Sequence, residues 1–116
     1  MDAVIYHNPA CGTSRKVLAA LREAGVEPKI VDYQKTPPDR ATLKRLLRLM
    51  GKSARDVLRK RGTPYEALGL DNPALGEEAI LDAISKHPIL LERPIVVVGD
   101  KAAICRPPET LAALLA

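Results

Sequence analysis

The chain has 116 residues, a formal net charge of +4 at pH 7, two cysteines, three tyrosines, and neither Phe nor Trp. A chain of this length can bury a core without disulfides, and here that core must be aliphatic. Two cysteines exclude a disulfide-rich scaffold. We expect no signal peptide and no membrane span, because no segment has the required apolar length. The expected compartment is therefore the reducing cytoplasm, where thiols stay free.

The mild positive charge suits an anionic ligand. The basic residues are not interleaved with aromatic residues, and no nucleic-acid-binding motif occurs, so we expect no nucleic-acid partner. No apolar seam stands out along the sequence, which favours a monomer.

The N-terminal part predicts a β-α-β unit. Residues 3–6 form a short apolar strand, residues 13–24 carry apolar side chains at helical spacing, and residues 29–33 form a second strand. Two strands joined by a helix run parallel and are connected by a right-handed crossover.

The middle of the chain predicts a helical insertion over about residues 39–86. Asp39 is the expected N-cap of a helix that ends at Gly51. A short helix is expected over residues 54–60, followed by turns and then by a helix over residues 77–86.

The C-terminal part predicts a β-hairpin and a last helix. Residues 95–98 and 102–105 form strands around a Gly-Asp turn, and two consecutive prolines, at 107 and 108, suit the start of a helix. The order β-α-β, helices, β-β-α predicts an α/β fold with a four-stranded mixed sheet. We expect residues 1–116 to form one domain.

The segment between the first strand and the first helix contains the candidate nucleophile, Cys11. Unpaired backbone N–H groups and the positive end of the helix dipole favour a thiolate there. His7 and Arg15 can add positive charge, which lowers a thiol pKa further. Gly12 lets the backbone approach a bound anion closely. These features predict a reactive thiolate beside an anion site; the alternative is a small buried hydrophobic residue.

Ser14 stands where a Cys-x-x-Cys redox pair would have its second cysteine. A self-contained dithiol is therefore not expected, and the resolving thiol must come from another molecule. Cys105 lies on a predicted strand without any pKa-lowering motif, so we expect it to be buried and inert. No residues have metal-ligand spacing, and no nucleotide-type glycine loop occurs.

Two arginines differ from those on the predicted helices. Arg93 and Arg106 are each followed by proline and flank the predicted hairpin. We expect Arg93 to point at the thiol, with a candidate cis bond before Pro94. The planar guanidinium group of arginine presents several N–H donors in a fixed arrangement, so it binds a tetrahedral oxyanion better than the ammonium group of lysine does. Arg59 is one of three consecutive basic residues, and the pattern alone leaves its role open.

These stretches resemble the glutaredoxin-coupled arsenate reductase family, whose fold is thioredoxin-like. The matching segments lie in the same order over nearly the whole chain, at residues 6–15, 58–60, 64–66, 68–70, 87–90, 93–97 and 105–107. The resemblance implies that Cys11 is the nucleophile and that His7 lowers its pKa. The family's three oxyanion-binding arginines and its cis-proline fall on Arg59, Arg93, Arg106 and Pro94.

The resemblance further implies an oxidoreductase of arsenical resistance that reduces arsenate to arsenite through a covalent cysteinyl-arsenate. Glutathione is the implied reductant, glutaredoxin the implied protein partner, and no cofactor is bound. Two alternatives with the same fold stay open. One is a relative that acts on glutathione mixed disulfides or on another oxyanion, which the three arginines argue against. The other is a redox-sensing regulator that binds RNA polymerase, which Ser14 in place of a second cysteine argues against.

Overall fold

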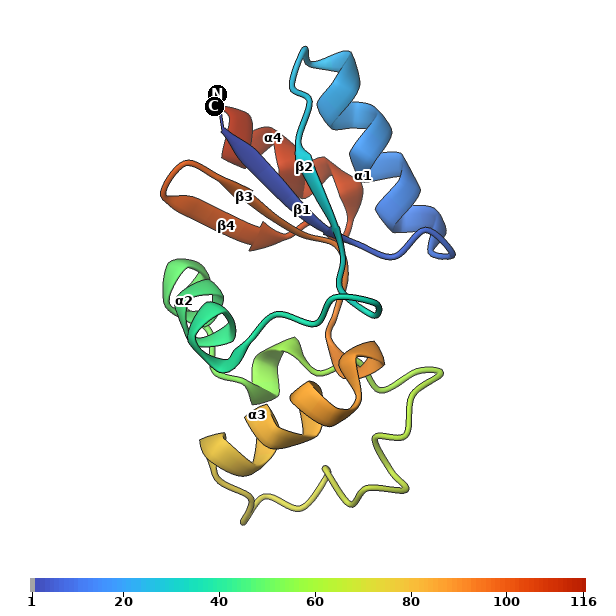
Figure 1. Ribbon diagram of the computed structural model, residues 1–116, viewed down its shortest axis with the longest axis vertical. Helices are drawn as coiled ribbons and strands as arrows, with labels where there is room; N and C mark the ends of the chain where they lie inside the picture. The colour runs from blue at the N-terminus through green and yellow to red at the C-terminus, as the bar shows by residue number, and fades with distance from the viewer. Residues whose placement is uncertain (1) are drawn as a thin grey trace. The chain divides into compact units, whose positions relative to one another are not determined.

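The computed structural model describes residues 2–116, which divide into two compact units (Figure 1). The first unit comprises the residues up to Thr36 together with Arg93–Ala116, and the second comprises Pro37–Glu92. The helices and strands of the first unit are β1 (Ala3–His7), α1 (Gly12–Glu23), β2 (Lys29–Asp32), β3 (Ile95–Val98), β4 (Lys101–Ile104) and α4 (Leu111–Leu115). The second contains α2 (Arg40–Met50) and α3 (Glu77–Lys86). None of the helices in residues 2–116 is long and apolar enough to cross a membrane.

The first unit is built on a four-stranded sheet with the order β2-β1-β3-β4. β1 runs parallel to β2, with His7 opposite Asp32, and antiparallel to β3, with Ile5 opposite Val96. β3 and β4 form the hairpin, with Ile95 opposite Ile104. This topology confirms the predicted mixed sheet, because a helical crossover gives a parallel pair and a tight turn gives an antiparallel one.

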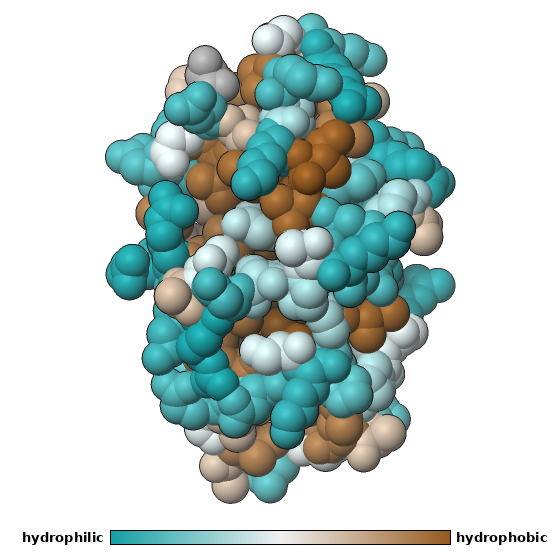
Figure 2. Space-filling model, in the orientation of Figure 1, coloured by the Kyte–Doolittle hydropathy of each residue, from teal (hydrophilic) through white to brown (hydrophobic). Residues whose placement is uncertain are grey.

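One apolar core joins a face of this sheet to both helices of the unit. Alternate residues of the strands supply it, because successive side chains of a strand point to opposite faces. The main contributors are Ala3 and Ile5 of β1, Val96 and Val98 of β3, Val17 and Leu21 of α1, and Leu111 and Leu114 of α4. The core is aliphatic, as the composition requires. The surface drawn in Figure 2 is mostly hydrophilic, with smaller apolar areas between polar side chains.

In the second unit, α2 begins and ends where the sequence predicts. The Asp39 carboxylate accepts a hydrogen bond from the backbone N–H of Thr42 at 2.8 Å, which caps the first turn. Gly51 ends the helix in the left-handed conformation, with φ of 66°. Leu43, Leu46 and Leu47 form the buried face.

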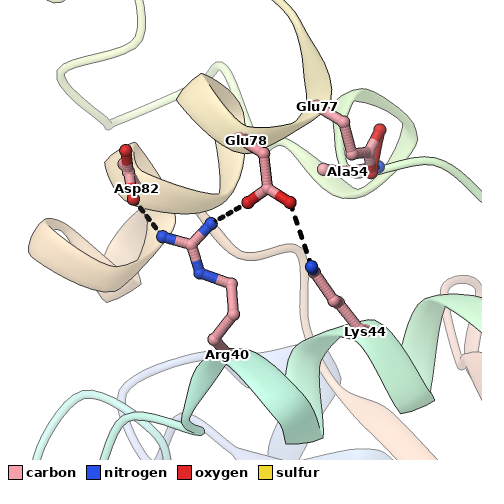
Figure 3. A network of polar contacts seen from close by, with 6 residues as sticks. All are labelled: Arg40, Lys44, Ala54, Glu77, Glu78 and Asp82. Atoms are coloured by element: carbon pink, nitrogen blue, oxygen red, sulfur yellow. Dashed lines mark hydrogen bonds and ion pairs between the residues drawn. The ribbon is translucent and has the colours of Figure 1, made fainter.

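Charged side chains connect α2 to α3 (Figure 3). Arg40 contacts both Glu78 and Asp82, and Lys44 Nζ lies 2.9 Å from Glu78 Oε1. The Lys44 ammonium, followed by Arg40, holds the pKa of Glu78 below its usual value. These groups are largely exposed, so the network orients the two helices more than it stabilises them.

One predicted helix, over residues 54–60, is wrong. Only Arg55–Val57 forms a 3₁₀ turn. Leu58 instead makes an antiparallel bridge with Leu91, and the backbone N–H of Arg59 continues this pairing at 2.7 Å. Pairing with a distant segment has overridden the local helical preference.

Gly51 offers a direct test of the α2 terminus. We expect Gly51→Ala to lower the free energy of unfolding by about 1 kcal/mol, because a Cβ atom disfavours positive φ. Denaturant unfolding measures this change, with Lys52→Ala at the adjacent exposed position as the control. Equal stability of Gly51→Ala and the unaltered protein would contradict the role of this cap.

Candidate active site

Cys11 lies where the chain leaves β1 and begins α1. Its extended backbone, with φ of −93° and ψ of 121°, makes it the N-cap residue, and its carbonyl accepts from Arg15 N–H at 3.0 Å. Asn8 shapes the preceding turn: its side-chain oxygen accepts from Ala10 N–H, and its carbonyl accepts from Cys11 N–H, both at 3.0 Å. The thiol is therefore held at the open end of the helix, where backbone N–H groups are available.

The pKa of the Cys11 thiol is lowered to about 7. Burial is the largest single influence and acts in the opposite direction, because it disfavours the charged form. The backbone N–H of Ser14 and hydrogen bonds from Arg93 and Arg106 outweigh burial. Arg106 Nη1 lies 3.7 Å from Sγ. Near neutral pH, about half of the thiol is therefore ionised.

Arg93, just before β3, and Arg106, just after β4, both reach the thiol from the open end of the β3–β4 hairpin. Arg106 Nη1 also donates to the carbonyl of Arg93 at 3.3 Å, so the two residues are tied together. The Arg93–Pro94 peptide bond is cis, and so is Arg106–Pro107, for which the sequence suggested nothing. The structure thus brings Cys11, Arg93 and Arg106 together within the first unit.

His7 lies at the site and contacts Ser14. Its side chain is buried, and this burial lowers its pKa, which disfavours the charged form of the ring. His7 Nδ1 lies 2.6 Å from Ser14 Oγ, and that oxygen accepts from Asn8 N–H at 3.1 Å. We assign the Ser14 hydroxyl proton to the contact with Nδ1, which leaves the ring proton on Nε2. His7 therefore anchors Ser14, and its predicted role in lowering the Cys11 pKa stays a prediction.

Ser14 and Asn8 are the site residues that sequence reasoning missed. From the sequence, Ser14 is notable only as the replacement for a second cysteine, and Asn8 has no assigned role. In the structure, Ser14 is fully buried, joins His7 to the turn through its hydroxyl, and offers its backbone N–H to the thiolate. The available signal was the spacing of Ser14 from Val17 and Leu21, which places it on the apolar face of α1, but the sequence did not show its hydrogen bonds.

Arg15 and Gly12 flank the thiol, and only Arg15 makes a side-chain contact that defines its role. Arg15 Nη1 donates to the carbonyl of Pro9 at 2.8 Å, so this arginine fastens the turn. A Cβ atom added at Gly12 would meet only Arg15 Nη2, at 3.7 Å, which is an ordinary contact. The predicted close approach of an anion to Gly12 stays a prediction.

Cys105 is fully buried in the core of the first unit. Burial raises the pKa of its thiol to about 11, so it stays protonated at neutral pH. Among the residues that the structure describes, His, Cys, Asp and Glu side chains form no cluster of three or more that could hold a metal ion.

Arg59, the third predicted arginine, belongs to the second unit. Its Nη1 lies 2.9 Å from Glu92 Oε1, and its Nε donates to the carbonyl of Arg61 at 3.1 Å. The guanidinium group, in a side chain that is 15% exposed, is therefore fixed on two sides.

Comparisons with known proteins agree with this architecture. The model of the ArsC family matches residues 6–114. The arsenate reductase of Rhizobium meliloti (strain 1021) is 47% identical over 115 residues, which cover 99% of this chain and 82% of that protein. The uncharacterized protein YfgD of Escherichia coli (strain K12) is 50% identical over 106 residues, covering 90% of this chain and 89% of that protein.

A solved structure, the arsenate reductase from Vibrio cholerae, superposes with a TM-score of 0.94 at 39% identity and covers 98% of both chains. The mixed sheet with a cysteine at the first strand–helix junction is that of a thiol-based enzyme of thioredoxin-like fold. This chain belongs to the ArsC family.

The ionisation of Cys11 can be followed by its rate of alkylation with iodoacetamide. We expect a half-maximal rate near pH 7, and an upward shift of this midpoint in Arg106→Ala, which removes a hydrogen-bond donor to the thiolate. Arg45→Ala, on the exposed surface of α2, is the control.

A midpoint near the ordinary thiol value in the unaltered protein would contradict this account of the site. Peptide mapping of the same samples should show modification at Cys11 and none at Cys105, whose thiol pKa is about 11.

Proposed function

We propose that the protein reduces arsenate to arsenite and that Cys11 is the nucleophile. The observation that carries this proposal is a thiolate with a pKa of about 7, held beside two guanidinium groups at the start of α1. A thiolate can approach an oxyanion only when the negative charge of the oxyanion is offset, and fixed donors do this without reorganising. The arsenate reductases among its relatives support the choice of oxyanion.

Arg93 and Arg106 would bind the oxygens of arsenate beside Cys11 Sγ, with backbone N–H groups of the first turn of α1, including Gly12, as further donors. Arg59 is proposed as the third arginine on the family resemblance. Within the second unit, Glu92 and Arg61 hold its Nη1 and Nε.

The first step forms the covalent intermediate. Cys11 Sγ attacks arsenic, an arsenic–sulfur bond forms, and an arsenic–oxygen bond breaks. The departing oxygen takes protons from solvent and leaves as water. Arsenic stays pentavalent, so this step needs no reductant.

Reduction then requires thiols from outside the chain, because Ser14 replaces a second cysteine and Cys105 is buried. Glutathione displaces a further oxygen as water and becomes bonded to arsenic. A glutaredoxin thiol then attacks the glutathione sulfur, and the sulfur–arsenic bond breaks with its electron pair left on arsenic. Arsenic becomes trivalent, and the glutathione–glutaredoxin disulfide forms. Water releases arsenite and restores Cys11.

This scheme explains the remaining expectations about the protein. No bound organic cofactor is required, since the reducing equivalents arrive as thiols. A reaction that takes its reducing equivalents from glutathione through glutaredoxin belongs in the reducing cytoplasm.

The test is arsenate-dependent NADPH consumption with glutathione, glutaredoxin and glutathione reductase. Cys11→Ser should abolish turnover. Arg93→Ala and Arg106→Ala should each lower kcat/KM by roughly 10- to 100-fold, the usual effect of losing a hydrogen bond to a charged group. Arg45→Ala serves as the surface control.

Retained turnover in Cys11→Ser would contradict the proposal. If arsenate gave no signal, and Arg93→Ala transferred glutathione from a mixed disulfide as fast as the unaltered protein, the thiol-transfer alternative would replace it.

A further inference from the structure

Tyr33 lies at the sheet edge where the Cys11 turn begins. In the parallel pair of β1 and β2, His7 lies opposite Asp32. Asn8 and Tyr33 are the next residues of the two strands, so they leave the sheet side by side. Tyr33 is therefore held against the base of the turn that carries the thiol.

The Tyr33 side chain is fully buried, with 0% of its surface exposed. Its hydroxyl makes no hydrogen bond of normal geometry with any residue from 2 to 116. Burial raises the pKa of Tyr33, so the phenol keeps its proton across the neutral range. A buried hydroxyl without a partner costs free energy, and native proteins contain few such groups.

The surroundings of this hydroxyl are those of the active site. The Arg93 guanidinium and the Cys11 thiolate act electrostatically on the Tyr33 phenol, and the Asn8 and Gln34 side-chain amides act on its oxygen as hydrogen-bond donors, which leaves the phenol proton without an acceptor. Arg93 and the Cys11 thiolate are also the groups between which the oxyanion would bind. The hydroxyl is a donor that lacks an acceptor in the free protein, and an oxyanion is a source of acceptors.

We propose that the Tyr33 hydroxyl is a further hydrogen-bond donor for the tetrahedral oxyanion and gains its acceptor when the anion lies beside Cys11. This inference rests on the proposed function, because it concerns the same anion site. The unpaired hydroxyl destabilises the free protein, and the bond to a charged oxygen recovers that free energy in the complex. Tyr33 thereby joins Arg93 and Arg106 in selecting an oxyanion.

The alternative is that Tyr33 only packs in the interior, a role for which its ring is sufficient. Tyr33→Phe distinguishes packing from hydrogen bonding to the anion, since it keeps the ring and removes only the hydroxyl. The matched control is Tyr65→Phe, at a buried tyrosine of the second unit that is 7% exposed.

Inorganic phosphate serves as an unreactive tetrahedral oxyanion, and its binding is measured by the protection of Cys11 from iodoacetamide. We expect the dissociation constant for phosphate to rise at least about 10-fold in Tyr33→Phe. Its Tm without anion should equal or exceed that of the unaltered protein. The pH midpoint of alkylation should stay near 7, because Tyr33 is not among the groups that set the thiol pKa.

An unchanged dissociation constant in folded Tyr33→Phe would overturn the proposal. So would a loss of folding, which would show that the hydroxyl has a structural partner, and so would the absence of phosphate protection in the unaltered protein. None of these results depends on turnover. A failure of the proposed arsenate reduction would appear instead in the NADPH assay, with phosphate protection intact.

Discussion

The active site of the first unit must hold a negative charge on a largely buried sulfur. Burial alone would raise the pKa of Cys11, and it is the largest influence on that thiol. A backbone N–H from Ser14 and two guanidinium groups reverse its effect. Each of these donors must therefore be fixed in place, because an arginine free to turn toward solvent would leave the thiol protonated.

The register of the sheet fixes the positions of the two arginines relative to Cys11. Ile95 and Ile104 face each other across the β3–β4 hairpin, so the residues beyond them, Arg93 and Arg106, lie at the same end of the sheet. β1 lies next to β3 in the antiparallel sense and delivers Cys11 to that end. The site is thus a consequence of strand order: the sheet brings together three residues that are far apart in the sequence, and α1 adds its N–H groups.

The sequence predicted those parts of the molecule that local patterns encode. Short apolar runs located the strands, apolar side chains at helical spacing located the long helices, and Asp39 and Gly51 located the ends of α2. The helix over residues 54–60 was wrong because a bridge between Leu58 and Leu91 decides that segment, and such pairing leaves no local pattern. Burial of the His7 ring, which lowers its pKa, likewise left no sign in the local sequence. The roles of Ser14 and Tyr33 appear only once packing shows which hydroxyl is paired and which is not.

In the proposed reaction, the Cys11 thiolate bonds to arsenic before any reductant takes part. Ultraviolet thiolate absorbance tests this directly, because Cys105, with a thiol pKa of about 11, contributes no thiolate at neutral pH. Arsenate added without glutathione or glutaredoxin should reduce the absorbance, since the adduct consumes the thiolate, while sulfate at the same concentration should not. The same absorbance after arsenate and after sulfate would contradict the account.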